Sequence, residues 1–432
     1  MCRIAKGLIA LVALVLLEVL SAADIPAPDS PMRPLGGSGP AVAGVAAHPP
    51  LGWNSWNTFG CLVTQDDVRA QADAMVSSGM RAAGYSYVVV DDCWFAPQRD
   101  VDGRLRADPA RFPAGMAALA DYMHAHGLKF GIYASPADRT CAQLSGNYPG
   151  ATGSAGHERT DAATFAAWGV DYLKYDWCSE DPDLRHQIRA FTAMRDALRA
   201  TGQPIVYSIN PNSGVAGDPP GRRFDWAGIA TMARTTQDVD SAWALDPAGS
   251  LAPNIGVTQA VTITAPLTSR TEGRYFNDPD MLVVGIPGAL GSLTPGLSQA
   301  EARTQVGMWA MMSAPLIAGN DVQRMPPWVR AMLINPAVLA VDQDIAGGPA
   351  IPLRSEPGVW RRPSSDGALV VACRNEGNRD RRWALSLAQL GLPAGRYTVI
   401  DLWTGATEPL AGQLVRTVGG HDTALLRIVP TP

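Results

Sequence analysis

The chain has 432 residues, of which 47% are hydrophobic and 17% charged, so it is long and apolar enough to bury a sizeable core. A net charge of −5 with no basic block argues against nucleic-acid binding, and no run of like charges indicates an interaction tail. The length predicts about two domains, or one barrel followed by a smaller module.

Residues 1–23 are typical of a secretory signal peptide. A basic start is followed by an apolar run over residues 7–20 and by the small residues Ser21-Ala22-Ala23. The run is short and Glu18 interrupts it, so we expect no stable membrane anchor. Such a leader predicts a secreted or periplasmic protein. Residues 24–48, rich in Pro, Gly and Ala, are expected to form a flexible lead-in.

Residues 49–347 alternate between strand-like and helix-like patterns. Strands are expected at Leu51–Trp56, Tyr87–Val90, Lys129–Tyr133, Tyr172–Tyr175, Ile205–Ile209, Met232–Thr236, within Tyr275–Val284 and at Ala314–Ala318. Helices are expected at Thr64–Ala83 with Thr64 as N-cap, Gly115–His126, Ala162–Trp168, Leu184–Ala200, Gln299–Met312 and Pro326–Leu333. About eight such units favour an α/β fold, a (β/α)8 TIM barrel, with a doubly wound open sheet as the alternative.

Residues 348–432 have a different pattern, with short alternating segments separated by Gly, Pro and Asp. These segments are Val359–Arg362, Ala368–Arg374, Arg382–Leu387, Arg396–Trp403 and Thr423–Ile428. They predict a small antiparallel β-domain, a sandwich, at the C-terminal end of the sequence.

The segment Tyr172–Cys178 carries an unusual pair of charges for a buried strand. Because side chains alternate along a strand, Tyr172, Lys174 and Asp176 are expected to point together to the inner face. A buried cation and carboxylate are costly unless paired, and an isolated Lys-x-Asp is most often a structural ion pair. Here other predicted strands also end in polar residues, which favours one shared pocket.

Polar and aromatic residues lie at the predicted strand ends, where barrels of this kind carry their chemistry. They are Trp53, Asn54, Trp56, Asp91, Asp92, Tyr133, Lys174, Asp176, Ser208, Asn210, Asn212, Arg234, Asp238, Asn277, Asp278 and Asp280. Singly, each has a structural explanation such as a helix cap, an Asx turn or core packing. Together they predict a pocket for a carbohydrate, whose hydroxyls need carboxylate and amide partners and whose ring faces need aromatic surface. Two carboxylates across a glycosidic bond are sufficient for its hydrolysis.

Other chemistries fit the sequence poorly. The six His residues form no His-x-x-x-His pattern, and neither a Cys-x-x-Cys pair nor a phosphate-binding loop is present, so no metal site is expected. Of the six cysteines, Cys2 lies in the leader, Cys373 is expected to be a buried free thiol, and Cys61, Cys93, Cys141 and Cys178 allow three pairings.

These motifs resemble glycoside hydrolase family 27, the α-galactosidase and α-N-acetylgalactosaminidase group. The resemblance extends from about Pro50 to Gly347 and rests on the conjunction of several motifs. They are Leu51-Gly52-Trp53-Asn54-Ser55-Trp56, Val90-Asp91-Asp92-Cys93-Trp94, Phe130-Gly131-Ile132-Tyr133, Tyr172–Cys178, Arg234-Thr235-Thr236-Gln237-Asp238 and Asn277-Asp278-Pro279-Asp280-Met281.

The resemblance implies a role for each matching residue. Asp176 matches the nucleophile and Asp238 the general acid/base of a hydrolysis that retains anomeric configuration, for which the carboxyl groups lie about 5–5.5 Å apart. Lys174 is expected to favour ionised Asp176, and Arg234 to oppose protonation of Asp238. Substrate-binding positions are implied at Trp56, Asp91, Asp92, Tyr133, Lys174, Arg234, Asp280 and Met281. The resemblance also implies disulfides Cys61–Cys93 and Cys141–Cys178, and no cofactor.

One departure concerns the fifth predicted strand, where many family members carry Cys-Glu-Trp and use the Glu to contact the sugar 2-hydroxyl. Here the segment is Ile209-Asn210-Pro211, so Asn210 takes the place of that carboxylate. We expect an exported retaining α-galactosidase. The alternatives are a β-L-arabinopyranosidase, an α-N-acetylgalactosaminidase or an isomaltodextranase-type enzyme and, more remotely, a Schiff-base lyase on Lys174 or a non-catalytic sugar-binding protein.

Overall fold

The computed structural model describes residues 45–431 except 216–218, 246–253, 269–274 and 289–295. The expected signal peptide, with Cys2, and the lead-in up to residue 44 lie outside the described residues. None of the described helices combines the length and hydropathy that a bilayer-crossing segment needs.

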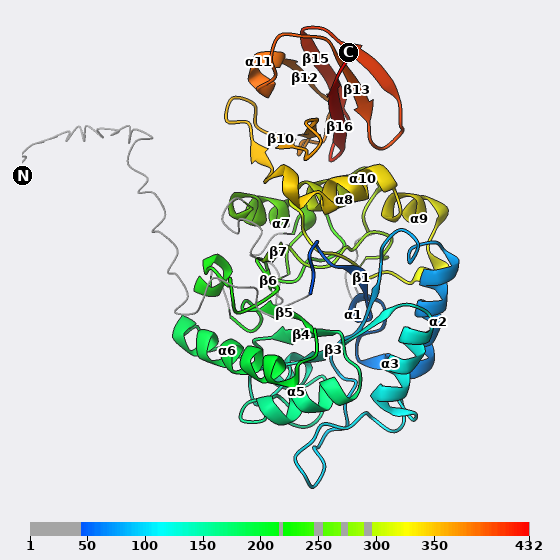
Figure 1. The fold of residues 1–432 in the computed structure, drawn as a ribbon, viewed down its shortest axis with the longest axis vertical. Coiled ribbons are helices and arrows are strands. Elements are labelled where there is room, and N and C mark those ends of the chain that lie inside the picture. Colours follow the sequence, from blue (N-terminus) through cyan, green and yellow to red (C-terminus); the bar gives the residue numbers. More distant parts are fainter. Residues whose placement is uncertain (1–44, 216–218, 246–253, 269–274, 289–295, 432) are drawn as a thin grey trace, which may run out of the picture.

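A parallel eight-stranded sheet forms the centre of the larger part of the molecule (Figure 1). Its strands are β1 (Leu51–Asn54), β2 (Tyr87–Val90), β3 (Lys129–Ala134), β4 (Tyr172–Asp176), β5 (Val206–Asn210), β6 (Met232–Arg234), β7 (Phe276–Asp278) and β8 (Leu316–Ala318). They follow the order β7-β6-β5-β4-β3-β2-β1-β8. Leu282, just after β7, bridges Ala318 of β8 in parallel and brings the two edges together. The predicted barrel is therefore confirmed.

Helices follow most of the strands. They are α1 (Trp56–Phe59), α2 (Gln65–Ser77), α3 (Gly115–Ala125), α4 (Cys141–Leu144), α5 (Glu158–Ala167), α6 (Leu184–Thr201), α7 (Val257–Thr264), α8 (Gln299–Met311), α9 (Pro327–Leu333) and α10 (Pro336–Gln343). Thr64 caps α2 in a capping box with Asp67, as expected. That helix ends at Ser77 rather than Ala83, because Gly79 follows in the left-handed region with φ +88°. Four helices of the barrel were not predicted from the sequence: α1, α4, α7 and α10. The first of them begins at Trp56, where a strand was expected, because β1 ends at Asn54.

The inner face of the barrel carries one apolar layer below the carboxyl ends of the strands. It consists of Tyr87, Val89, Tyr172, Val206, Met232 and Phe276, from β2, β4, β5, β6 and β7. This layering is usual for such barrels. Tyr172 is therefore packed inside the barrel, and the side chains that follow it on the same face, Lys174 and Asp176, emerge above this layer.

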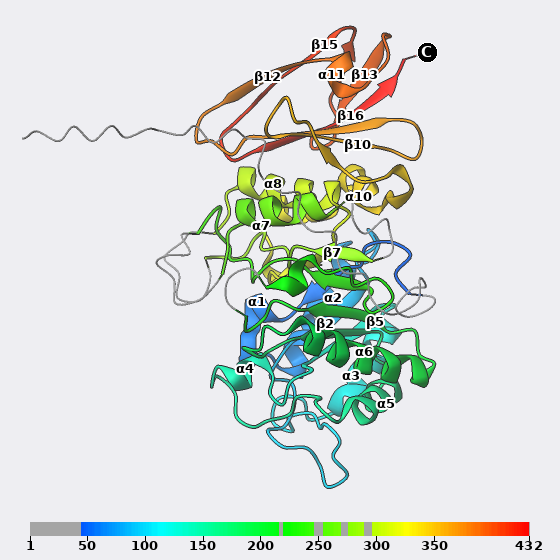
Figure 2. The ribbon, with the colours of Figure 1, turned by 90° about the vertical axis from the view of Figure 1, so that its left-hand side faces the viewer.

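The C-terminal β-domain packs on the barrel through α8 and α10 (Figures 1 and 2). Its strands are β9 (Ile351–Pro352), β10 (Val359–Pro363), β11 (Leu369–Arg374), β12 (Arg381–Ser386), β13 (Tyr397–Asp401), β14 (Thr407–Leu410), β15 (Gln413–Val418) and β16 (Thr423–Pro430), with a short helix α11 (Leu387–Leu390). Strands β12 and β15 form a separate pair, and the other six form one antiparallel sheet. The expected antiparallel β-domain is confirmed.

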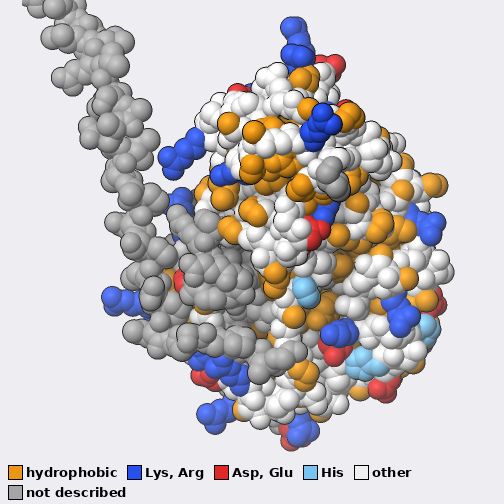
Figure 3. Space-filling view, turned by 45° about the horizontal axis from the view of Figure 1, so that its top comes forward, with side chains coloured by type: hydrophobic (Ala, Val, Ile, Leu, Met, Phe, Trp, Pro, Cys, Tyr) orange, Lys and Arg blue, Asp and Glu red, His pale blue; other side chains and the backbone are white. Residues whose placement is uncertain are grey.

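Strand β11 serves two hydrophobic cores because its side chains alternate between its faces. Val370 and Ala372 belong to the core that also contains α8, whereas Val371 and Cys373 belong to the core between the two sheets of the β-domain. The barrel and the β-domain thus share buried surface instead of meeting at a polar boundary. On the face seen in Figure 3, the cationic side chains are scattered, and several in the lower half lie next to acidic ones.

Candidate active site

The structure gathers the expected site residues at the carboxyl ends of the barrel strands. Trp56 follows β1, Asp91 and Asp92 follow β2, Tyr133 lies in β3, Lys174 and Asp176 in β4, Asn210 ends β5, Arg234 ends β6, and Asp280 and Met281 follow β7. Asp238 lies four residues after Arg234 on the segment that leaves β6. One edge of the sheet therefore presents all of these side chains.

Lys174 connects two buried carboxylates. Its Nζ donates to Asp91 Oδ2 at 2.7 Å and lies 3.9 Å from Asp176 Oδ2. Asn54 Nδ2 donates to the same Asp91 oxygen at 2.6 Å. Lys174 is thus the close partner of Asp91 and a looser partner of Asp176. Burial acts to lower the pKa of Lys174, but the two carboxylates outweigh it and raise that pKa.

Asp176 combines burial with a free oxygen. The residue is only 6% exposed, and its Oδ1 has no hydrogen-bond partner among the described residues. Burial raises its pKa to about 7, against the lowering effect of Lys174, while Asp91 adds to the increase. Lys174 therefore favours the ionised form of Asp176, as expected, but burial is the larger effect and the net shift of the pKa is upward. The pKa of Asp176 is thus close to neutral pH, and its Oδ1 is available to accept a hydrogen bond.

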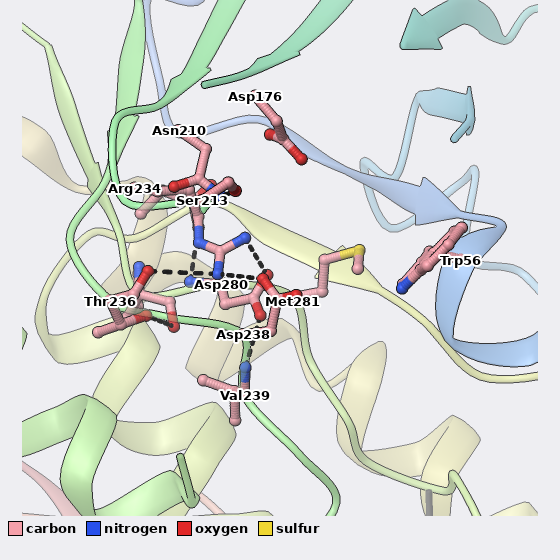
Figure 4. Close-up of polar contacts among 12 residues, drawn as sticks. Trp56, Asp176, Asn210, Ser213, Arg234, Thr236, Asp238, Val239, Asp280 and Met281 are labelled. Carbon is pink, nitrogen blue, oxygen red and sulfur yellow. Dashed lines mark hydrogen bonds and ion pairs between the residues drawn. The ribbon is translucent and has the colours of Figure 1, made fainter. Parts of the chain in front are cut away.

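Arg234 connects two further carboxylates. It donates to Asp238 Oδ1 at 2.9 Å and lies 2.8 Å from Asp280 Oδ1. Asp280 Oδ2 accepts from the backbone N–H of Val239 at 2.7 Å, so it also holds the segment that follows Asp238. In Figure 4 the carboxylate of Asp176 lies apart from this ion-paired group, on the side of Asn210. Burial raises the pKa of Asp280 to about 7 despite Arg234.

Asp238 is the accessible member of this group, with 60% of its side chain exposed. Partial desolvation acts to raise its pKa, but the Arg234 guanidinium and the Lys174 ammonium give a net shift downward. Arg234 is 4% exposed at its side chain and keeps Asp280 as a second anion. The contact between Arg234 and Asp238 can therefore open without leaving a buried cation unpaired.

The two disulfides implied by the resemblance are present in the structure. They join Cys61 to Cys93 and Cys141 to Cys178. Cys373 is a buried free thiol, as expected, and burial raises its pKa to about 12. Because thiolates are the reactive form, Cys373 is inert near neutral pH.

Asp92 is held by the helix that one of these disulfides fixes. Its Oδ2 accepts from the backbone N–H of Ala142 at 2.8 Å, next to Cys141. Burial raises its pKa to about 6 although this hydrogen bond lowers it. The Tyr133 hydroxyl lies 3.2 Å from Cys178 Sγ at the other end of the bridge. The disulfide thus supports Asp92 and Tyr133 together.

Opening the Cys141–Cys178 bridge is expected to destabilise the protein. We predict that the double variant Cys141→Ser/Cys178→Ser loses about 2–5 kcal/mol of unfolding free energy, the usual effect of removing a native disulfide. Urea unfolding of the variant and of the oxidised wild type measures the difference. Equal unfolding midpoints and slopes for the two proteins would contradict the prediction.

Asn210 lies directly beside Asp176, because the two residues are register partners on β4 and β5. Its Nδ2 donates to Ser213 Oγ at 2.6 Å, and its Oδ1 accepts from the Asn212 backbone N–H at 3.0 Å. The side chain is buried and neutral. Next to Asp176, this side chain therefore presents an amide that is already hydrogen-bonded at both ends.

Trp56 and Met281 are the apolar members of the site. Trp56 is partly exposed, and its backbone N–H is fixed by Asn54 Oδ1 at 2.8 Å. In Figure 4 the Trp56 ring stands across from the Arg234 group, and the Met281 side chain extends toward it.

In the parts of the chain that the structure describes, no group of three or more His, Cys, Asp or Glu could hold a metal ion.

Some contributors were not recognised from the sequence. Ser213 fixes Asn210, and Trp309 of α8 donates its Nε1–H to the Asp280 backbone oxygen at 2.8 Å. Ser213 lies three residues after Asn210 in a polar turn, a spacing that could have indicated the contact. Trp309 is distant in sequence and gave no local signal.

Comparisons with known proteins match both parts of the chain. A family model described as Alpha galactosidase A matches residues 48–344, and one described as the Alpha galactosidase C-terminal beta sandwich domain matches residues 355–428. The Alpha-galactosidase A of Cellvibrio japonicus is 36% identical over 400 residues, covering 89% of this chain and 93% of the relative. The Alpha-N-acetylgalactosaminidase of Gallus gallus is 36% identical over 378 residues, covering 84% and 88%. The crystal structure of alpha-galactosidase I from Mortierella vinacea has a TM-score of 0.79 and 30% identity, covering 90% of this chain and 98% of that one.

Proposed function

Because the chain belongs to the alpha-galactosidase family, glycoside hydrolase family 27, we propose that it is a secreted retaining α-galactosidase that removes terminal α-linked galactose from oligo- or polysaccharides. The observation that carries the proposal is that two pairs of carboxylates, each around one cation, lie at the same edge of the barrel sheet. One group is Asp91 and Asp176 around Lys174, and the other is Asp238 and Asp280 around Arg234.

The first half of the reaction forms a covalent glycosyl-enzyme. The Asp176 carboxylate attacks the anomeric carbon, and the bond from that carbon to the leaving oxygen breaks. Asp238 gives its proton to the leaving oxygen, so the aglycone departs as a neutral alcohol. In the second half, water gives a proton to Asp238 while its oxygen displaces Asp176 from the anomeric carbon. Two inversions return the α-anomer and the starting enzyme.

The remaining site residues bind and orient the sugar. Asp91 and Asp92 offer carboxylate oxygens to the ring hydroxyls, with Lys174 as a donor between them. Trp56 offers an aromatic face, and Tyr133 lines the pocket floor. We assign Arg234, Asp280 and Met281 to the side of the pocket that carries the acid/base, and Asn210 to the side of the nucleophile Asp176.

The proton on Asp238 is gained as the substrate binds. In the structure Arg234 holds the pKa of Asp238 below its ordinary value, which disfavours the protonated form that a general acid needs. A sugar that enters beside Asp238 separates it from Arg234, which retains Asp280. Loss of the cation and loss of water both raise the pKa of Asp238.

The stereochemical course tests the proposed function. Cleavage of an aryl α-galactoside, followed by proton NMR from the first seconds, is expected to show α-galactose before mutarotation produces the β-anomer. Initial β-galactose would exclude the double displacement, and binding without cleavage would point to a sugar-binding protein.

The pH profile is expected to depend on Asp176. We predict that kcat/KM declines as the pH falls through about 7, because this value is the pKa of Asp176 and only its anion attacks. The same group makes the unfolding free energy fall as the pH rises from about 4 to 7, since the native state keeps a proton that the unfolded chain has lost. An Asp176→Asn variant, followed by thermal unfolding, should show a weaker dependence than the wild type, because Asp92 and Asp280, whose pKa values are also raised, still contribute. An acid limb of kcat/KM centred near pH 4 would contradict the predicted pH profile of activity.

A second specificity within the family is favoured by Asn210. A neutral amide, already bonded to Ser213, offers the 2-position of the sugar a weaker acceptor than a carboxylate does. β-L-arabinopyranosides, N-acetylgalactosaminides and α-glucosides therefore belong in one panel of aryl glycosides with the α-galactoside. A higher kcat/KM for any of them would replace galactose as the proposed sugar.

Lyase chemistry on Lys174 is disfavoured by its surroundings. A Schiff-base lysine needs a lowered pKa, whereas Asp91 and Asp176 raise that of Lys174.

We infer secretion from the leader pattern in residues 1–23 and from two disulfides, which persist mainly in oxidising compartments.

A further inference from the structure

We propose that His421, in the turn between β15 and β16 of the C-terminal domain, is a positioning residue for Asp238. The proposal rests on the function proposed above, in which Asp238 is the acid/base. It gives the β-domain a part in the reaction although none of its described residues lies at the carboxyl edge of the barrel sheet. The connection passes through Trp243, five residues after Asp238.

The first link is a stack of two rings across the domain boundary. The rings of Trp243 and His421 lie with centroids 4.5 Å apart and planes inclined by 11°. Both ring nitrogens of His421 have partners: Nδ1 lies 2.9 Å from Glu301 Oε1 of α8, and Nε2 lies 2.7 Å from Asn378 Oδ1. With both nitrogens held, the ring cannot rotate without breaking hydrogen bonds, so it offers Trp243 a fixed surface.

The second link fixes the turn that carries His421. Thr304 Oγ1 of α8 donates to the His421 backbone oxygen at 2.7 Å. Arg303 binds both carboxylate oxygens of Asp422, at 2.9 and 2.6 Å. His421 itself has φ +61°, a left-handed conformation that is uncommon for residues other than glycine, although His adopts it more often than most. The turn therefore has a defined position on the barrel.

The third link runs from Trp243 back to Asp238. The backbone oxygen of Trp243 accepts from the N–H of Thr258 at 3.0 Å, in the first turn of α7. Ile255 pairs with the same segment through its backbone. Its N–H donates to the backbone oxygen of Asp238 at 2.9 Å, and its backbone oxygen accepts from the Asp240 N–H at 2.8 Å. The segment from Asp238 to Trp243 is thus bonded at both ends, so a displacement of Trp243 is transmitted to Asp238.

Asp238 needs such external support because its own side chain is not enclosed. Its side chain is 60% exposed, whereas those of Asp176 and Asp280 are 9% and 4% exposed. A general acid must lie within hydrogen-bond reach of the leaving oxygen, and a misplacement of about 1 Å can cost roughly 100-fold in rate. Stacking at Trp243 is therefore expected to affect proton donation to the aglycone and to leave attack by Asp176 intact.

Leaving groups of different acidity separate these two effects. Dinitrophenolate departs without a proton, whereas the sugar leaving group of melibiose needs one. For His421→Asn, which tolerates the left-handed backbone but has no ring to stack, we expect kcat/KM on melibiose to fall roughly tenfold. On 2,4-dinitrophenyl α-galactoside it is expected to change by less than about threefold. Equal losses on both substrates, or no loss on either, would overturn the proposal.

Variants on the barrel side and in the same turn complete the test. Trp243→Phe keeps a ring over His421 and should retain melibiose activity, whereas Trp243→Leu should repeat the selective loss. Asp422→Asn weakens the ion pair with Arg303 that fixes the turn carrying His421, so a smaller loss of the same selective kind is expected from it. An equal loss on both substrates for Asp422→Asn, or a Trp243→Leu variant indistinguishable from Trp243→Phe, would count against His421.

The variant Asp238→Ala separates failure of this inference from failure of the proposed function. If Asp238 is the acid, its removal slows melibiose far more than the dinitrophenyl substrate. A selective loss in Asp238→Ala without one in His421→Asn rejects only the role of His421. If Asp238→Ala itself shows no selectivity, the acid/base assignment fails and the inference fails with it.

Discussion

Replacement of Asp176 by Ala is expected to lower kcat on an aryl α-galactoside by about 10⁴-fold or more, because no other group can form the glycosyl-enzyme bond. The substitution also removes a buried carboxylate whose Oδ1 has no partner, so folding should be retained. Circular dichroism and steady-state kinetics on the same preparation measure the two properties. Asp181→Ala is a suitable control, since Asp181 follows the same strand but pairs with His186 outside the barrel edge.

Azide distinguishes the role of Asp176 from that of Asp238. In Asp176→Ala the small anion can enter the space of the lost carboxylate and displace the aglycone once, which gives β-galactosyl azide. In Asp238→Ala, Asp176 still forms the intermediate, and azide then displaces it from the other face to give the α-azide. Proton NMR of the products decides between them. Wild-type-like kcat in Asp176→Ala, or the α-azide from that variant, would refute the nucleophile assignment.

Removal of the Lys174 charge is expected to have the largest effect on stability. In Lys174→Met, Asp91 loses a partner at 2.7 Å and Asp176 one at 3.9 Å, and both carboxylates remain buried. Breaking a buried ion pair from one side costs about 3–5 kcal/mol. We expect this loss in urea unfolding at pH 8, and a smaller one at pH 5.5, where Asp176 takes up a proton and its charge disappears.

The same variant should move the acid limb of kcat/KM above its wild-type position, since Lys174 lowers the pKa of Asp176. Lys129→Met is the matched control: Lys129 is exposed on the neighbouring strand β3, with Tyr87 Oη at 3.4 Å, and its removal should cost less than about 1 kcal/mol. A Lys174→Met protein as stable at pH 8 as the Lys129→Met protein would show that the buried cation is dispensable.

The sequence was most informative where local pattern and tertiary environment agree. The strand Tyr87–Val90 and the start of α2 at Thr64 were predicted to the residue or nearly so, because buried β-branched runs and capping boxes are local signals. The helix α10 was missed: the prediction ended at Leu333, two residues before Pro336, although Asn335 as N-cap and Pro336 at the first helical position are local signals of a new helix.

The site was predictable as a set of residues but not as an electrostatic system. Strand alternation places Lys174 and Asp176 on one face, yet only the fold shows that Asp91 is the nearer partner of Lys174. The pairing of Arg234 with both Asp238 and Asp280 likewise depends on how β6 and β7 end. Net pKa shifts are small differences between burial and charge effects, and a sequence contains neither quantity.

The two-sided packing of β11 has a consequence for engineering. Val370 and Ala372 complete the apolar surface that begins on α8. A barrel truncated after residue 347 would therefore expose the apolar side of α8 to water. Chimeras that exchange this module between homologous hydrolases must therefore transplant the matching side of α8 with it, and a library of C-terminal truncations should yield aggregates instead of a minimal enzyme.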